Sequence, residues 1–178
     1  MISFAPQFSG TVKIRTPVAP FFRQFKQRME AGLILGEPHW RWRYVVEEFS
    51  DSELTFGAAT FMTAINIGLN RVTLHKVGPN QIEYKVTYRI WAAYCVVLGA
   101  VLALIGFALY FFLDIGEVIA RQRILPDAGL NQAVGLAIYW GSIIGWGILW
   151  PWVLIGLHKS PVRKFLLRII SEVDISST

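Results

Sequence analysis

Two long stretches without a charged residue constrain this chain more than any other feature. They cover residues 91–113 and 133–157. Because an α-helix rises 1.5 Å per residue, each stretch would form a helix about 34–38 Å long. That length crosses a hydrocarbon core of about 30 Å with some tilt. The sequence therefore predicts a two-helix transmembrane hairpin, with residues 114–132 as the external loop.

The charges that flank the hairpin predict its orientation. Lys85 and Arg89 precede the first stretch, and a basic segment follows the second. The loop holds Arg121 and Arg123, offset by three acidic residues. Since loops on the cytoplasmic side carry the excess of Lys and Arg, both termini are expected in the cytoplasm of an integral inner (cytoplasmic) membrane protein. Only 16% of the 178 residues are charged, which agrees with a membrane protein.

Residues 1–90 carry the patterns of a small cytoplasmic α+β domain of order β-α-β-β-β-β. Apolar residues alternate with polar ones most clearly over residues 82–90, which is typical of a half-buried strand. A helix is expected over residues 21–35, where apolar residues recur every four positions. The expected strands cover residues 9–16, 40–49, 53–62, 65–77 and 82–90.

Residues 54–70 fit this domain less easily because they contain no charge. At 17 residues the passage is at the lower limit for a third membrane crossing. Its three threonines and two asparagines favour the other interpretation, two paired strands of the domain core.

The chain ends in a short amphipathic helix within residues 158–178. Its apolar residues gather on one face, and its basic residues are Lys159, Arg163, Lys164 and Arg168. A basic amphipathic helix beside a membrane segment typically lies among anionic lipid headgroups. Packing against the cytoplasmic domain is the equally supported alternative.

Small residues predict how the two membrane helices pack. Ala137, Gly141 and Gly145 recur every four residues in the second stretch, and Cys95, Gly99 and Ala103 do so in the first. Such ladders let two helices approach closely. We therefore expect the two ladders to face each other, with a kink at Pro151.

Aromatic residues mark the other faces of the helices. Six are expected to anchor the hairpin at the two membrane interfaces: Trp91, Tyr94, Tyr110, Tyr139, Trp140 and Trp152. Trp146 and Trp150 lie one turn apart, nearly opposite the ladder of the second stretch, and Trp146 lies too deep for an interface anchor. This pair is a candidate contact for a partner or a flat hydrophobic ligand such as a pigment, quinone or lipid.

The sequence gives no support for catalysis or metal binding. His39, His75 and His158 have no ligand partner at metal spacing, so no cofactor with recognisable ligands is expected. The aromatic and basic run 39–44 is read as a strand rather than a nucleic-acid site, and the acidic residues of 47–53 as a solvated turn. Neither membrane stretch contains an ionisable Asp, Glu, Lys, Arg or His, which disfavours a transporter or channel component.

Two functions remain. The first is a non-catalytic accessory subunit of a large membrane complex, by analogy an energy-converting one such as a photosynthetic reaction centre or antenna, or a respiratory complex. Its partners would be other membrane subunits and anionic lipid. The second is a membrane-tethered module for a lipid or isoprenoid, with a sheet curved around a helix, which is similar in outline to the helix-grip architecture of START-like domains. The residues expected to line its cavity are Trp40, Trp42, Phe56, Tyr84 and Tyr88.

Overall fold

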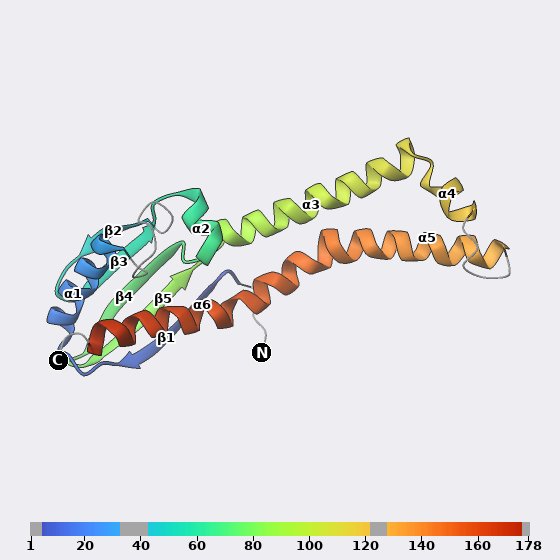
Figure 1. The fold of residues 1–178 in the computed structure, drawn as a ribbon. Helices are drawn as coiled ribbons and strands as arrows, with labels where there is room; N and C mark the ends of the chain where they lie inside the picture. Colours follow the sequence, from blue (N-terminus) through green and yellow to red (C-terminus); the bar gives the residue numbers. More distant parts are fainter. Residues whose placement is uncertain (1–4, 33–42, 122–127, 176–178) are drawn as a thin grey trace. The chain divides into compact units, whose positions relative to one another are not determined.

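The chain divides into two units in the computed structural model, which describes residues 5–32, 43–121 and 128–175. We name Met1–Ala92 with Gly156–Thr178 the sheet domain, and Ala93–Ile155 the hairpin. The hairpin is therefore inserted between two parts of the sheet domain, and a helix continues across each boundary (Figure 1).

The sheet domain is built on five antiparallel strands in the order β1-β5-β4-β3-β2 (Figure 1). The strands are β1 (Gln7–Lys13), β2 (Tyr44–Phe49), β3 (Glu53–Ala58), β4 (Arg71–Gly78) and β5 (Gln81–Thr87). The α+β class and the number of strands agree with the prediction. The alternation in β5 places Ile82, Tyr84 and Val86 completely inside the domain and leaves Glu83 and Lys85 exposed.

Several predicted boundaries were wrong. The first helix, α1, covers Val18–Ala31 rather than residues 21–35. The strand expected over residues 82–90 ends at Thr87, because Ile90 already belongs to the next helix. Of the strand expected over residues 40–49, Tyr44–Phe49 is found. Trp40 and Trp42 lie outside the described residues.

The uncharged passage 54–70 is neither a membrane crossing nor two continuous strands. It contains most of β3, then the short helix α2 (Phe61–Ile67), and β4 begins only at Arg71. The Thr60 hydroxyl accepts a hydrogen bond from the N–H of Thr63 and caps α2 at its start. Gly68 ends the helix in the left-handed conformation, with φ of 80°. The predicted pairing of β3 with β4 is present on either side of this insertion.

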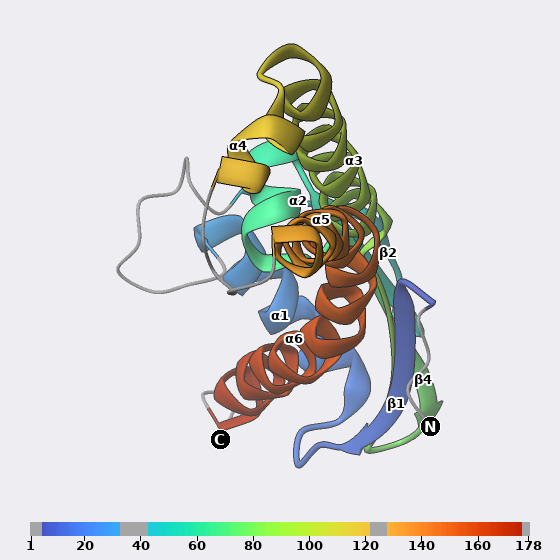
Figure 2. The ribbon, with the colours of Figure 1, turned by 90° about the vertical axis from the view of Figure 1, so that its right-hand side faces the viewer.

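One face of the sheet is covered by α1 and by the last part of helix α6 (Trp150–Ile175) (Figure 2). Phe21, Phe22 and Phe25 of α1 are completely buried in this core. The core residues that α6 contributes are Val162, Leu166, Ile169, Ile170 and Val173. The amphipathic tail therefore packs on the sheet domain, as the second of the two interpretations of this segment expects.

The hairpin consists of two long apolar helices joined by a shorter one. The first is α3 (Arg89–Phe112), and α4 (Ile115–Arg121) follows it. The second begins with α5 (Ala128–Ile144), passes through a π-helical turn, η1 (Gly145–Leu149), and continues as α6. Both long helices are long and apolar enough to cross a membrane. The second does not end at residue 157 as expected, and the predicted loop 114–132 contains α4 and the start of α5.

Candidate partner-binding groove on the helical hairpin

The two long helices pack closely through small residues in the middle of the hairpin. A methyl group added to Gly99 would lie 2.5 Å from Cγ of Pro151 and 2.6 Å from the carbonyl oxygen of Gly147. One added to Gly147 would lie 2.5 Å from Cβ of Ala103. The contact thus leaves no room for a larger side chain at either glycine.

The structure places the small residues of the two predicted packing faces differently. Cys95 and Gly99 are buried and Ala103 is half-buried. In the second helix, however, Ala137 and Gly141 are exposed, and neither Gly141 nor Gly145 has a neighbour that an added methyl group would meet.

Before residue 145 the side of the second helix that faces α3 includes Ile143, which a methyl group added to Gly106 would meet at 2.9 Å, and not Ala137 or Gly141. A π turn begins at Gly145 and shifts the residues that follow. The N–H of Trp150 bonds to the carbonyl oxygen of Gly145, five residues back, so the turn holds more residues than a regular α-helical turn. A helical wheel with 100° per residue therefore misplaces every residue after Gly145.

Trp146 and Trp150 form an exposed aromatic pair beside this turn. Their ring centroids are 5.2 Å apart at an interplanar angle of 60°. The side chains remain 59% and 41% exposed, respectively. Both residues of the predicted partner face are thus on the surface of the hairpin.

A groove of about 410 Å³ opens next to Trp146, between α3, α4 and α5. This volume is within the range of small-molecule sites. Residues that line it include Leu102, Ile119, Ile138, Tyr139, Ser142 and Trp146. The Tyr139 hydroxyl donates to the carbonyl oxygen of Gly106, and the Ser142 hydroxyl to that of Ile138. Because both hydroxyl hydrogens are already used, the groove best fits an apolar group.

The structure brings three of the six predicted interface aromatics together. Tyr110 contacts Trp140 and Tyr139, with ring centroids 4.9 Å and 5.9 Å apart. Phe107 joins this group at 5.5 Å from Trp140. Tyr94 and Trp152 are exposed on the hairpin.

Trp91, the sixth, belongs to the sheet domain and is half-buried. Its ring stacks on His158 at 3.7 Å with an interplanar angle of 8°, and Tyr88 packs against the same histidine. Gly68 lies so close to His158 that no larger residue fits there. Burial lowers the pKa of His158 to about 4, although the carbonyl of Ile67 acts in the opposite direction. His158 is therefore neutral near pH 7. No sequence pattern predicts this cluster, because its members are far apart in the chain.

The basic residues of α6 differ in their contacts. Arg163 donates from Nε to the Tyr84 hydroxyl at 3.0 Å, and Arg168 pairs with Glu172 at 2.8 Å. Lys164 is exposed and Lys159 is half-buried. Since the apolar face of this helix is covered by the sheet, only its outer, basic side is open to lipid headgroups.

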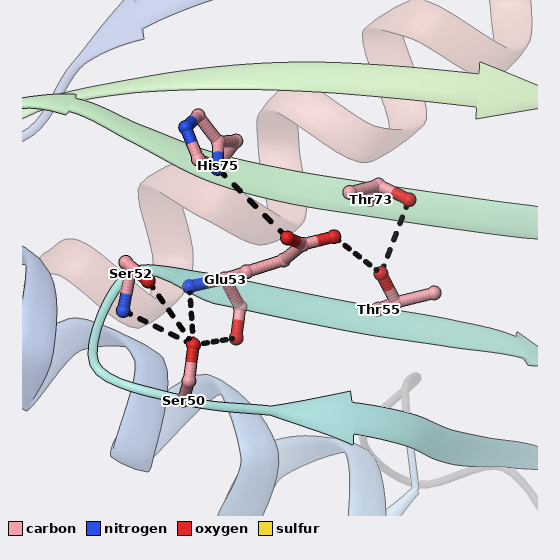
Figure 3. Close-up of polar contacts among 6 residues, drawn as sticks. All are labelled: Ser50, Ser52, Glu53, Thr55, Thr73 and His75. Carbon is pink, nitrogen blue, oxygen red and sulfur yellow. Dashed lines mark hydrogen bonds and ion pairs between the residues drawn. The ribbon is translucent and has the colours of Figure 1, made fainter.

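Residues 47–53, predicted as a solvated acidic turn, form the end of β2, a turn over residues 50–52 and the first residue of β3 (Figure 3). The Ser50 hydroxyl accepts hydrogen bonds from the N–H groups of Ser52 and Glu53. Nδ1 of His75 lies 4.0 Å from a carboxylate oxygen of Glu53, and the Thr55 and Thr73 hydroxyls are 3.1 Å apart. Within the described residues no three His, Cys, Asp or Glu side chains are grouped to hold a metal ion. His39 lies outside those residues.

Three of the five residues predicted to line a ligand cavity in the sheet domain lie in the described part of the chain, and these three leave no space for one. Phe56, Tyr84 and Tyr88 are each 0% exposed. A cavity that could hold a lipid would leave part of these side chains accessible. Phe56 instead packs on Phe25 and Tyr44.

Comparisons with known proteins identify no relative of this chain: no family model, curated protein or solved structure matches it. The arguments below therefore depend on the residues and their geometry alone.

Proposed function

We propose that the hairpin crosses the inner (cytoplasmic) membrane and that the sheet domain lies on its cytoplasmic side. Only 11% of the most apolar window of each long helix is buried, whereas a core helix of a soluble protein would be mostly covered. Large apolar side chains such as Leu104 and Phe112 are 68% and 85% exposed. Exposing these apolar side chains to lipid costs no free energy, whereas exposing them to water is unfavourable. The basic flanks support this orientation, because Lys and Arg are enriched on the cytoplasmic side of membrane helices.

On this basis the protein is a non-catalytic accessory subunit of a larger membrane complex. The observation that carries this proposal is the exposed Trp146–Trp150 pair beside an apolar groove, in the middle of the hairpin. Tryptophans at the membrane interface are explained by anchoring, but Trp146 lies away from the helix ends. Exposed aromatic residues next to a recess are typical of the anchors of protein interfaces.

The groove also supports contact with a hydrophobic cofactor of such a complex. Its lining suits the edge of a pigment or quinone held by another subunit, since it offers apolar surface and no metal ligand. Photosynthetic and respiratory complexes are the examples we favour by analogy.

The test is whether the protein migrates with other subunits. After extraction of native membranes with a mild detergent, native electrophoresis should place the chain in a large band of fixed stoichiometry. Trp146→Ala should insert normally but weaken assembly by about 2 kcal/mol or more, roughly thirtyfold, if it is an interface anchor. Trp152→Ala is the matched control, because Trp152 is similarly exposed but lies nearer the basic flank. Equal assembly of both variants would contradict the proposal.

The second candidate function is binding of a lipid or isoprenoid by the protein alone. The 410 Å³ groove favours it, with the site in the hairpin instead of the sheet domain. Migration of the chain by itself on the native gel, together with a co-purified lipid lost in Trp146→Ala, would support this second candidate over the first.

A further inference from the structure

Helix α2 exposes two large apolar side chains that the proposed subunit role does not explain. Phe61 and Met62 are 57% and 60% exposed, although the following residues, Thr63 and Ala64, are buried. The helix is firmly held by its Thr60 and Gly68 caps, so this exposure belongs to a defined surface of the sheet domain.

This surface lies where both long helices join the sheet domain. The Asn70 side chain donates to the carbonyl of Ala64 in α2 at 2.9 Å. Its Oδ1 accepts hydrogen bonds from the N–H groups of Ile90 and Trp91 at the start of α3, at 2.6 Å and 3.3 Å. Figure 1 shows α2 beside this first turn of α3. Gly68, at the other end of α2, packs on His158 of α6.

The charges around α2 favour an anionic lipid surface. No charged residue occurs from Leu54 to Asn70, so the helix carries no carboxylate that a bilayer would repel. Basic residues are next to its contacts in both helices: Arg89 precedes Ile90 in α3, and Lys159 follows His158 in α6. An apolar tip beside basic residues is the pattern of segments that dip into the headgroup region.

We propose that α2 inserts Phe61 and Met62 into the lipid–water interface on the cytoplasmic side, and so holds the sheet domain against the membrane. This rests on the proposed membrane crossing, since the interface must lie near the first turn of α3. The uncharged passage 54–70 is too short for a third crossing, but through α2 it would contact the surface of the membrane. A protein partner is the competing occupant, but the exposed apolar surface here is only two side chains on a seven-residue helix.

The experiment measures the surroundings of a spin label at Met62→Cys. The full chain, with its single cysteine removed as Cys95→Ala, is reconstituted in vesicles of phosphatidylcholine and phosphatidylglycerol. Collisions of the label with oxygen, which concentrates in lipid, are compared with collisions with a water-soluble nickel chelate. Val77→Cys is the matched aqueous control, since Val77 is 55% exposed and lies near the other end of β4, about 20 Å from Arg71. Leu104→Cys is the control within the hairpin.

We expect the oxygen-to-nickel ratio at Met62 to exceed that at Val77 several-fold and to approach that at Leu104. A ratio at Met62 equal to that at Val77, with Leu104 in lipid, would overturn this inference and leave the membrane crossing intact. Shielding of the Met62 label from both reagents would overturn it in favour of a protein contact. Nickel access at Leu104 would overturn the membrane crossing itself, and this inference with it.

Discussion

The carboxylate of Asp174 fixes the end of α6 against the sheet domain. It accepts hydrogen bonds from the backbone N–H groups of Arg15 and Thr16 at 2.9–3.0 Å, where the chain leaves β1. Burial acts to raise its pKa, but these N–H groups, the Thr16 hydroxyl and the Arg15 charge together hold the pKa of Asp174 below 3.8. The carboxylate therefore stabilises the fold when it is ionised.

We expect Asp174→Ala to lower the free energy of unfolding of the sheet domain by about 1–3 kcal/mol, because two N–H groups lose a charged acceptor. Chemical denaturation at pH 7 measures this loss. Since the folded pKa is depressed, the contribution of Asp174 is complete above its unfolded value near 3.8 and disappears as the pH falls through the folded pKa. The difference between variant and wild type should therefore shrink below pH 3.8.

Asp51→Ala is the control for this prediction. Asp51 pairs with Arg23 at 3.8 Å, but the two side chains are 76% and 65% exposed. Solvent screens such a pair, so its loss should change stability by less than about 1 kcal/mol. An equal effect of the two aspartates would mean that the N–H contacts of Asp174 do not carry its contribution.

The long helices meet where Gly99 of α3 packs against Gly147 and Pro151, at the π turn of the second helix. Gly99→Ala should force them apart, because the new methyl group would meet Pro151 and Gly147, and we expect a cost of about 1–3 kcal/mol. Gly141→Ala should be neutral or slightly stabilising, since nothing lies within 4 Å of the added group and Ala favours a helix. Unfolding of both variants in mixed micelles, followed by circular dichroism, compares them. A larger loss of stability in Gly141→Ala than in Gly99→Ala would mean that the helices pack through the predicted ladder Ala137, Gly141 and Gly145.

The sequence predicted those features of the fold that depend on a pattern within one segment, and missed those that depend on contacts between segments. The alternation in β5 identified the buried Ile82, Tyr84 and Val86, because a strand repeats every two residues. Helix α2 escaped detection because seven residues are too few to show a helical period. The apolar face of α6 was found but not its partner, since lipid and a sheet select the same pattern.

For the candidate site, the sequence predicted the two tryptophans but not the groove beside them. Trp146 and Trp150 were proposed from their spacing along one helix, and both are exposed. The groove beside them also needs Leu102 and Ile119, which come from other helices. No periodicity within one segment reveals a recess between three segments, nor the stack of Trp91 on His158.

The sheet domain is made from both ends of the chain, so it depends on the return of α6 from the hairpin. Five residues of α6 lie in its core. Their burial is worth about 1.5–3 kcal/mol each, which together is comparable with the whole stability of a domain of this size, about 5–15 kcal/mol. Without α6, the sheet would expose much of its apolar face.

A chain in which a short Gly/Ser linker replaces Ala93–Ile155 should therefore fold as a soluble sheet domain. The linker can be short, because Trp91 and His158 next to its two ends stack at 3.7 Å. A chain that ends at Ala92 should aggregate or remain unfolded, because it keeps the sheet but lacks α6. Size-exclusion chromatography and far-ultraviolet circular dichroism distinguish the two chains. If the chain that ends at Ala92 folds as well as the linked one, the core does not need α6. If neither folds, the hairpin itself is required, and the division of the molecule into two separately stable units is wrong.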